Sequence, residues 1–432
     1  MSNQRAEVRP ASSSVVWTVV GLCLLAINLR PALGSVSPLL GDIQDALGLS
    51  DAAVSVLTTL PVLCLGVFAA AAPGLARRLG LASALVLGLV ALVAGVLVRL
   101  VPSTAALFIG TTLAGAGLAI GNVLMPAVIK TAFPTKIRLY TGIGTAILSG
   151  GAALSAGVAV PLRNAVGGDW NDALGIWAVP AVVALVPWLV LARRAVKPTT
   201  PAAGAATARG SLRGDALSWQ VTGYLALRAL VFFTALGWLP MVLSDFGYSD
   251  AGSGGLLSLA MAVSVPGALF APVLAGRFLG MRAVVTMVAV ASAVSLIGLL
   301  VAPGIAALWV VLLGLSLGAG HALALTFIGL RSPDPQVAAQ LSGMVQTVGY
   351  LVGALAGPFA LGIISGATGS WTVPLILLAA FTLPELILGL LSSRDRFVRP
   401  RTVAGPAPTV APAGAPAGPE QTQAREEVRV AD

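Results

Sequence analysis

The sequence predicts an all-α integral membrane protein with twelve transmembrane helices, arranged as two pseudo-symmetric bundles of six. The composition sets the class, because 57% of the 432 residues are hydrophobic, only 9% are charged and the mean hydropathy is +0.96. Apolar stretches long enough to cross a bilayer as helices, about 17 to 25 residues each, recur along the whole chain. The second half also repeats features of the first at a nearly constant spacing, which predicts two related bundles.

The apolar stretches follow one another at short intervals, and we take each as one helix. They are centred near residues 26, 62, 90, 117, 149, 182, 230, 263, 291, 317, 352 and 381. Eleven or thirteen spans also fit, because Ala/Gly-rich segments such as Gly110 to Ile129 are only moderately hydrophobic. The first stretch lacks a small-residue cleavage site and ends in Asn28-Leu-Arg-Pro31, so it is a retained helix rather than a removed signal peptide.

The basic residues fix the orientation, since Lys and Arg of short loops stay on the cytoplasmic side. With the N-terminus inside, 21 of the 25 basic residues fall in cytoplasmic segments, Arg99 and Arg163 lie outside, and Arg30 and Arg228 lie in the membrane. The chain is therefore expected in the plasma (inner) membrane as a multi-pass protein with both termini cytoplasmic. The net charge of +9 reflects this orientation and an attraction to anionic lipid heads, and no soluble basic surface for nucleic acid is evident.

Changes in composition divide the chain into segments. The expected segments are a cytoplasmic N-terminal tail (1–14), an N-terminal six-helix bundle (15–192), a Pro- and Ala-rich cytoplasmic linker (193–217), a C-terminal six-helix bundle (218–392) and a disordered cytoplasmic tail (393–432).

The two bundles match at an offset of 199 to 203 residues. The matching pairs are Trp17 and Gly21 with Trp219 and Gly223, Pro73 and Gly80 with Pro272 and Gly280, Gly115-Ala-Gly117 with Gly318-Ala-Gly320, Gly142 with Gly343, and Trp170 with Trp371. Agreement at equivalent helix positions indicates a duplicated six-helix unit. Parallel halves joined by a cytoplasmic loop resemble the major facilitator superfamily, whose architecture implies a substrate cavity between the halves near the midplane.

Several local motifs resemble one branch of that superfamily, the cyanate and 2-nitroimidazole transporter family. They are Asn28 to Leu40, Leu57 to Gly66, Gly121 to Pro126 with Phe133-Pro134, Trp238-Leu-Pro240, and Leu341 to Tyr350 followed by Gly357-Pro358. The resemblance covers residues 15 to 392 and implies transport, whereas it leaves the cargo open, because family members are named for different cargoes.

The chain departs from the family pattern at two positions. Ala76 stands where the gating motif of the superfamily commonly has an acidic residue, in the loop that carries Arg77 and Arg78. The corresponding loop of the second half carries Arg277, and we expect these three arginines in gating loops. Arg228 stands where the family pattern more often has a glutamine, which implies a different cargo.

Two intramembrane arginines are the leading candidates for substrate binding. Arg228 lies about 11 residues, or roughly 16 Å, into the seventh span, while Arg30 is nearer the outer interface. Each belongs to the first helix of its half, so both guanidinium groups are expected to face one cavity and offer planar donor forks to an anion. The alternative for Arg30 is that it reaches outward to lipid phosphates or pairs with Asp42 or Asp45.

The remaining candidates are uncharged or titratable. The substrate-binding set is completed by Asn28, Asn122, Trp238, His321, Gln346 and Tyr350; Trp238 enters through the family motif. His321 and Glu385 are candidates for proton coupling. For Glu385 the alternative is a structural role with a partner arginine, and for His321, Asn122, Gln346 and Tyr350 it is hydrogen bonding between helices.

The motifs for enzymes and metal sites are weak or missing. Gly314-Leu-Ser-Leu-Gly318 matches the pattern of a nucleophile elbow, but it lies in an apolar helix rather than at a strand-to-helix turn. Cys23 and Cys64 lie within spans, and the sequence has no Walker A loop. We therefore expect no enzyme activity, metal or cofactor.

Together these observations predict a secondary carrier that works as a monomer by alternating access. Its cargo is expected to be a small polar or anionic organic solute, cyanate- or nitroimidazole-like, with protons as a candidate coupling ion and the direction open. A multidrug or metabolite exporter of the same fold is the alternative.

Overall fold

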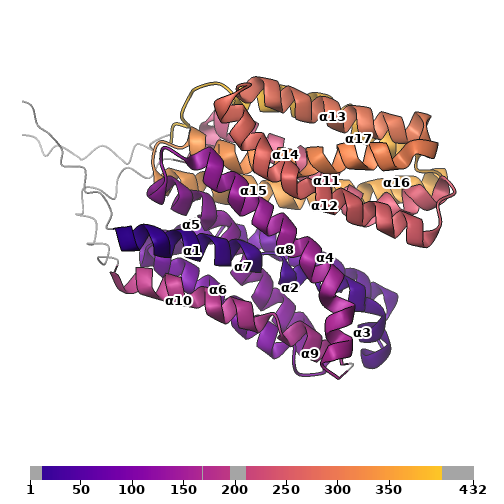
Figure 1. The fold of residues 1–432 in the computed structure, drawn as a ribbon, viewed down its shortest axis with the longest axis horizontal. Coiled ribbons are helices and arrows are strands. Elements are labelled where there is room, and N and C mark those ends of the chain that lie inside the picture. The colour runs from indigo at the N-terminus through magenta and orange to yellow at the C-terminus, as the bar shows by residue number, and fades with distance from the viewer. Residues whose placement is uncertain (1–11, 168, 195–210, 401–432) are drawn as a thin grey trace, which may run out of the picture.

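The structure, a computed structural model, describes residues 12–167, 169–194 and 211–400 (Figure 1). Most of the predicted tails and linker, residues 1–11, 195–210 and 401–432, lies outside the described residues. Figure 1 shows two helical bundles side by side, one coloured from indigo to magenta and the other from orange to yellow.

The first bundle contains six spans, three of which consist of more than one helix. Its elements are α1 (Ser12–Asn28) with α2 (Pro31–Gly34), η1 (Ser37–Leu39), α3 (Leu40–Leu47), α4 (Asp51–Ala69) with α5 (Ala72–Leu79), α6 (Leu81–Val98), α7 (Thr104–Ala132), α8 (Ile137–Ala165), and α9 (Trp170–Gly175) continuing into α10 (Ala178–Arg194). The second span bends by 50° where α4 passes into α5.

The second bundle repeats the pattern with longer unbroken helices. Its elements are η3 (Leu212–Gly214), α11 (Ala216–Asp245), α12 (Asp250–Arg277), α13 (Met281–Val301), η4 (Pro303–Ile305), α14 (Ala306–Arg331), α15 (Pro335–Ala354), the π-helical turn η5 (Leu355–Phe359), α16 (Ala360–Thr368) and α17 (Thr372–Ser392). Ten spans of the described chain are long and apolar enough to cross a membrane, the bent pair α4–α5 is an eleventh, and the apolar part of α1, Val15–Asn28, completes the predicted twelve.

Local sequence signals explain where many of these helices begin. Five of them start after a Ser or Asp whose side-chain oxygen accepts a hydrogen bond from the backbone NH three residues on: Ser50, Ser103, Asp215, Ser249 and Asp334. Such a cap satisfies one of the free donors of the first turn and contributes about 1 kcal/mol. The sequence therefore sets the helix starts locally, and burial of apolar faces holds the helices together.

The predicted duplication is visible in the helix packing. A Cβ placed on Gly115 of α7 would lie 2.6 Å from the Cβ of Cys64 in α4, the second span of its half. Gly318 of α14 is in the same position relative to α12, where a Cβ would overlap the carbonyl oxygen of Ser264. Equivalent glycines thus bring the fourth and second spans together in both halves.

Substituting Gly318 by alanine should push α12 and α14 apart. The added methyl would overlap backbone, which cannot move aside as a flexible side chain does, so we expect a loss of about 1 to 3 kcal/mol in unfolding free energy. Thermal unfolding of the purified variant measures this loss. Gly254→Ala in α12 is the matched control, because a Cβ there has no neighbour within 4 Å; equal stability of the two variants would contradict the prediction.

The two halves are in close contact at one end of the molecule, which we call the basic face because it carries Arg77, Arg78, Lys136, Arg138 and Arg277. There a Cβ on Gly343 of α15 would lie 2.6 Å from Pro73 of α5, and a Cβ on Gly142 of α8 would lie 2.8 Å from the carbonyl oxygen of Leu269 in α12. Farther along α8, a Cβ on Gly157 would have no neighbour within 4 Å. The described halves are thus closed against each other at the basic face.

The tail predicted to be disordered from residue 393 is instead packed against the second half up to Val398. Val398 is buried and donates its NH to the carbonyl of Arg331 at 2.8 Å, and Nη1 of Arg331 donates to Asp395 at 2.8 Å. Phe397 lies under the ammonium group of Lys130, 5.9 Å from the ring centroid. This segment therefore connects the last span of the second half to α7 of the first.

Candidate functional site

The first span is interrupted at the position of Arg30. Helix α1 ends at Asn28 and α2 begins at Pro31, because a proline disfavours helical geometry in the residue before it. The amide of Asn28 donates to the carbonyls of Leu24 at 2.7 Å and Pro180 at 3.0 Å, which fixes the end of α1 against α10. Asn28 therefore acts on the site indirectly, by fixing the helix break at which Arg30 lies.

The far side of the break is held by Arg99, which the orientation argument placed in an outer loop. Its side chain is buried, and its Nη1 donates to the carbonyl of Ala32 in α2 at 2.8 Å. From the sequence, Arg99 is only a basic residue at the end of a span, and its contact with α2 was not predicted.

Arg30 lies between the halves, over an aromatic surface from the second half. Its Cζ is 5.9 Å from the ring centroid of Phe232 in α11, and the ring of His321 in α14 lies 6.5 Å from that of Phe232. The ring of Tyr350 in α15 is 6.4 Å from His321 and inclined to it by only 19°. We call Arg30, Phe232, His321 and Tyr350 the Arg30 cluster.

The cluster has polar groups available for a ligand. Nε2 of His321 and the hydroxyl of Tyr350 are buried and have no hydrogen-bond partner among the described residues, while the side chain of Arg30 is half-buried. A guanidinium group beside two unused hydrogen-bonding groups and three flat rings suits a small anion or a planar polar solute. Arg30 pairs with neither Asp42 nor Asp45 in the described residues, because the partner of Asp42 is Arg163.

Below the cluster, toward the basic face, Asn122 and Gln346 join the two halves. Nε2 of Gln346 in α15 donates to the backbone carbonyl of Asn122 in α7 at 3.0 Å and to Ser342 at 2.8 Å. The amide of Asn122 donates to Leu118 within its own helix at 3.2 Å. Oε1 of Gln346 has no partner among the described residues, so it remains available one helical turn from Tyr350.

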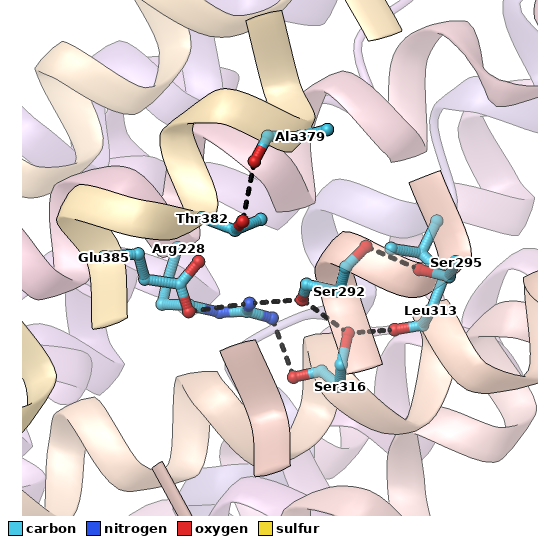
Figure 2. A network of polar contacts seen from close by, with 8 residues as sticks. All are labelled: Arg228, Ser292, Ser295, Leu313, Ser316, Ala379, Thr382 and Glu385. Atoms are coloured by element: carbon cyan, nitrogen blue, oxygen red, sulfur yellow. Dashed lines mark hydrogen bonds and ion pairs between the residues drawn. The ribbon is translucent and has the colours of Figure 1, made fainter. Parts of the chain in front are cut away.

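Arg228 occupies a separate buried network within the second half (Figure 2). Its Nη1 donates to Glu385 of α17 at 3.0 Å and to Ser292 of α13 at 2.9 Å, and its Nη2 donates to the carbonyl of Ser316 in α14 at 2.7 Å. The arginine and the glutamate are each about 1% exposed. The expected arrangement, with the two arginines in one cavity, differs from this geometry, because Glu385 holds Arg228 inside its own bundle.

Trp238 and the arginines of the gating loops lie outside the Arg30 cluster. Trp238 donates from Nε1 to the carbonyl of Pro358 at 2.8 Å and packs on Trp371, with ring centroids 5.1 Å apart, so it ties α11 to η5 and α17. Arg77, Arg78 and Arg277 are exposed at the basic face.

Phe232 is the residue of the cluster that the sequence analysis missed. One signal was available, since Phe232 follows Arg228 by four residues and so lies one helical turn away from it. An aromatic residue in an apolar helix is nevertheless ordinary, and nothing in the sequence connects it to Arg30.

Two duplicated six-helix bundles that meet around an intramembrane cation define a multi-pass membrane transporter. The sequence signature of the Major Facilitator Superfamily matches residues 19–357, and the chain belongs to this superfamily and, within it, to the family of cyanate and 2-nitroimidazole transporters. Members of the family are transporters, not enzymes.

The relatives match along most of their length. The uncharacterized transporter YycB of Bacillus subtilis (strain 168) is 38% identical over 88% of this chain and 94% of its own. The 2-nitroimidazole transporter of Escherichia coli (strain K12) is 37% identical over 88% of this chain and 96% of its own, and the cyanate transport protein CynX of the same organism is 30% identical over 81% and 90%. The solved structure of the proton:xylose symporter XylE covers 90% of this chain and 98% of its own, with a TM-score of 0.70 at 13% identity.

Proposed function

We propose that the protein is a secondary active carrier of a small polar or anionic organic solute, cyanate- or nitroimidazole-like, and that the solute binds at the Arg30 cluster. The main support is the position of the Arg30 guanidinium group. It lies at a helix break between the halves, beside Nε2 of His321 and the hydroxyl of Tyr350, which have no hydrogen-bond partner among the described residues. The relatives that transport 2-nitroimidazole and cyanate support this substrate class.

We infer that the carrier works by alternating access and that the basic face is cytoplasmic, in the plasma membrane. The distribution of Lys and Arg supports this orientation. Closure of the halves at the basic face then corresponds to an outward-facing state, with Gln346 and Asn122 beneath the binding site. Of the two candidates for proton coupling, His321 belongs to the proposed site, whereas Glu385 is engaged by Arg228.

A thermal-shift experiment on the purified protein tests the substrate class. A ligand that binds only the folded state stabilises it, by about 2.7 kcal/mol at a concentration of 100 times the Kd. We expect cyanate or 2-nitroimidazole to raise Tm. Tyr350→Phe should weaken the affinity for the ligand about two- to tenfold through the loss of one hydrogen bond, so a higher ligand concentration is needed for the same rise in Tm.

Tyr248→Phe is the matched control, because the Tyr248 hydroxyl donates to Pro303 away from the Arg30 cluster, at 2.8 Å. Stabilisation by lipophilic cations without any response to the anions would favour the exporter instead. An identical ligand response in both tyrosine variants would remove Tyr350 from the site.

A further inference from the structure

A cavity lies between the halves at the basic face. It is lined on one side by residues 134–139, which end the α7–α8 loop and begin α8, and on the other by Val273, Gly276 and Arg277 at the end of α12 and Leu330 near the end of α14. Its volume is about 270 Å³. It therefore contacts both halves at the place where they close against each other.

The lining is cationic. Lys136 and Arg138 from the first half and Arg277 from the second line the cavity, and none of the ten lining residues is acidic. Nε of Arg138 is buried and has no hydrogen-bond partner among the described residues. The stem of Arg138 is fixed on Gly276, where a Cβ would lie 2.5 Å from Cδ of the arginine. Three positively charged residues thus line a space without a counter-charge in its walls.

One acidic group that interacts with Arg138 is Asp395, and it is already engaged. Asp395 accepts a hydrogen bond from Arg331 at 2.8 Å, and this bond, the charge of Arg331 and the charge of Arg138 hold the pKa of Asp395 below its usual value. The Asp395 side chain is nevertheless fully exposed, so water screens its charge. It does not supply the partner that Nε of Arg138 lacks.

The part of the cationic lining that comes from the first half has no counterpart at the other seam between the halves. At the offset of 199 to 203 residues, the counterparts of Lys136 and Arg138 fall within Pro335–Leu341, a stretch without any charged residue. Duplication alone would give both seams the same charges. Lys136 and Arg138 are therefore specific to the seam between α8 and α12, whereas the counterparts of Arg277 in the first half are Arg77 and Arg78.

We propose that this cavity binds a phosphate-bearing anion, which bridges the two halves through Lys136, Arg138 and Arg277. Guanidinium groups offer planar donor forks that match phosphate oxygens, and an ammonium group adds a mobile charge. Two sources share this chemistry, namely free inorganic phosphate and the headgroup of an anionic phospholipid. Exposed Leu139, Phe278 and Leu279 near the cavity offer an apolar surface for lipid chains.

Binding at this place has a conformational consequence. An anion that contacts both halves gains its full interaction only while they are closed at the basic face, so it shifts the population toward that closed state. The site is separate from the Arg30 cluster and does not depend on the identity of the transported solute.

The test uses the full-length protein, with the double variant Arg138→Gln/Arg277→Gln and the matched control Arg282→Gln, an exposed arginine of α13 that does not line the cavity. In the first arm, inorganic phosphate is titrated in neutral detergent against chloride at equal ionic strength, and Tm is measured. In the second, native mass spectrometry counts phospholipids retained from nanodiscs of phosphatidylcholine with or without phosphatidylglycerol. We expect binding at least about tenfold weaker in the double variant than in the control.

The two arms separate the sources of the anion. A rise in Tm with phosphate identifies a free anion, and retention of phosphatidylglycerol without any response to phosphate identifies a headgroup. No response in either arm, or equal responses in the double variant and the control, would overturn the proposal. If the double variant does not fold, Lys136→Gln at an exposed position replaces it, with a smaller expected loss.

Discussion

Replacing Arg30 by alanine is expected to abolish transport while the protein still inserts into the membrane and unfolds close to the wild-type temperature. Arg30 lies outside both helices of its span, and its contact across the halves is a cation–π interaction with Phe232, which contributes about 0.5 to 2 kcal/mol. A solute held by a charge-assisted hydrogen bond would lose about 1.5 to 3 kcal/mol of binding. Uptake of cyanate or 2-nitroimidazole into proteoliposomes measures the effect.

Two further arginine variants control this experiment. Arg30→Lys keeps the charge but loses the planar fork, so partial transport is expected. Arg163→Ala removes an arginine of the same half that pairs with Asp42 away from the Arg30 cluster, and should leave transport near wild type. Unchanged uptake by the Arg30→Ala variant would exclude Arg30 from the site.

Replacing Glu385 by alanine is expected to destabilise the protein by about 3 to 5 kcal/mol, because it leaves a buried arginine without its counter-charge. Arg228 and Glu385 are about 1% exposed, so water cannot take the place of the carboxylate. Thermal unfolding of purified protein and the yield of folded protein from membranes measure the loss. Wild-type stability of the single variant would show that the pair does not hold the second half together.

The charge-free double variant Arg228→Met/Glu385→Leu distinguishes a structural pair from one used in transport. Replacing a buried ion pair by apolar residues of similar size is often neutral or stabilising, so the double variant should regain most of the lost stability. Transport by this variant would identify the pair as structural. A folded double variant without transport would show that the pair takes part in the transport cycle.

The sequence predicts more of the fold than of the site. Twelve spans follow from hydropathy, and the duplication follows from repeated glycines and tryptophans. Both can be read directly from the order of residues along the chain, without knowing which helices touch. The direction in which a charged side chain points from its helix cannot be predicted in this way, since it depends on a partner elsewhere in the chain. The position of Arg228 within the seventh span follows from the sequence, but the geometry that keeps its side chain within its own bundle depends on Glu385, 157 residues away.

The same reasoning explains the residues that sequence alone left out. Phe232 matters because the break at Arg30 faces it, and Arg99 matters because the carbonyl of Ala32 lies within reach of its guanidinium. Neither residue type is unusual where it stands. By contrast, Asn28-Leu-Arg-Pro31 indicated a charge within the first span, and the structure places a helix break at the same residues.

The ion pair between Arg228 and Glu385 also bears on how the protein is made. It joins the first and the last span of the second half, α11 and α17, so during synthesis α11 enters the membrane well before its partner exists. Until α17 is inserted, the partners of Arg228 are restricted to serine hydroxyls, backbone carbonyls and the insertion machinery. The last helix therefore completes the core of this half, and a chain that ends before it would leave Arg228 without its counter-charge.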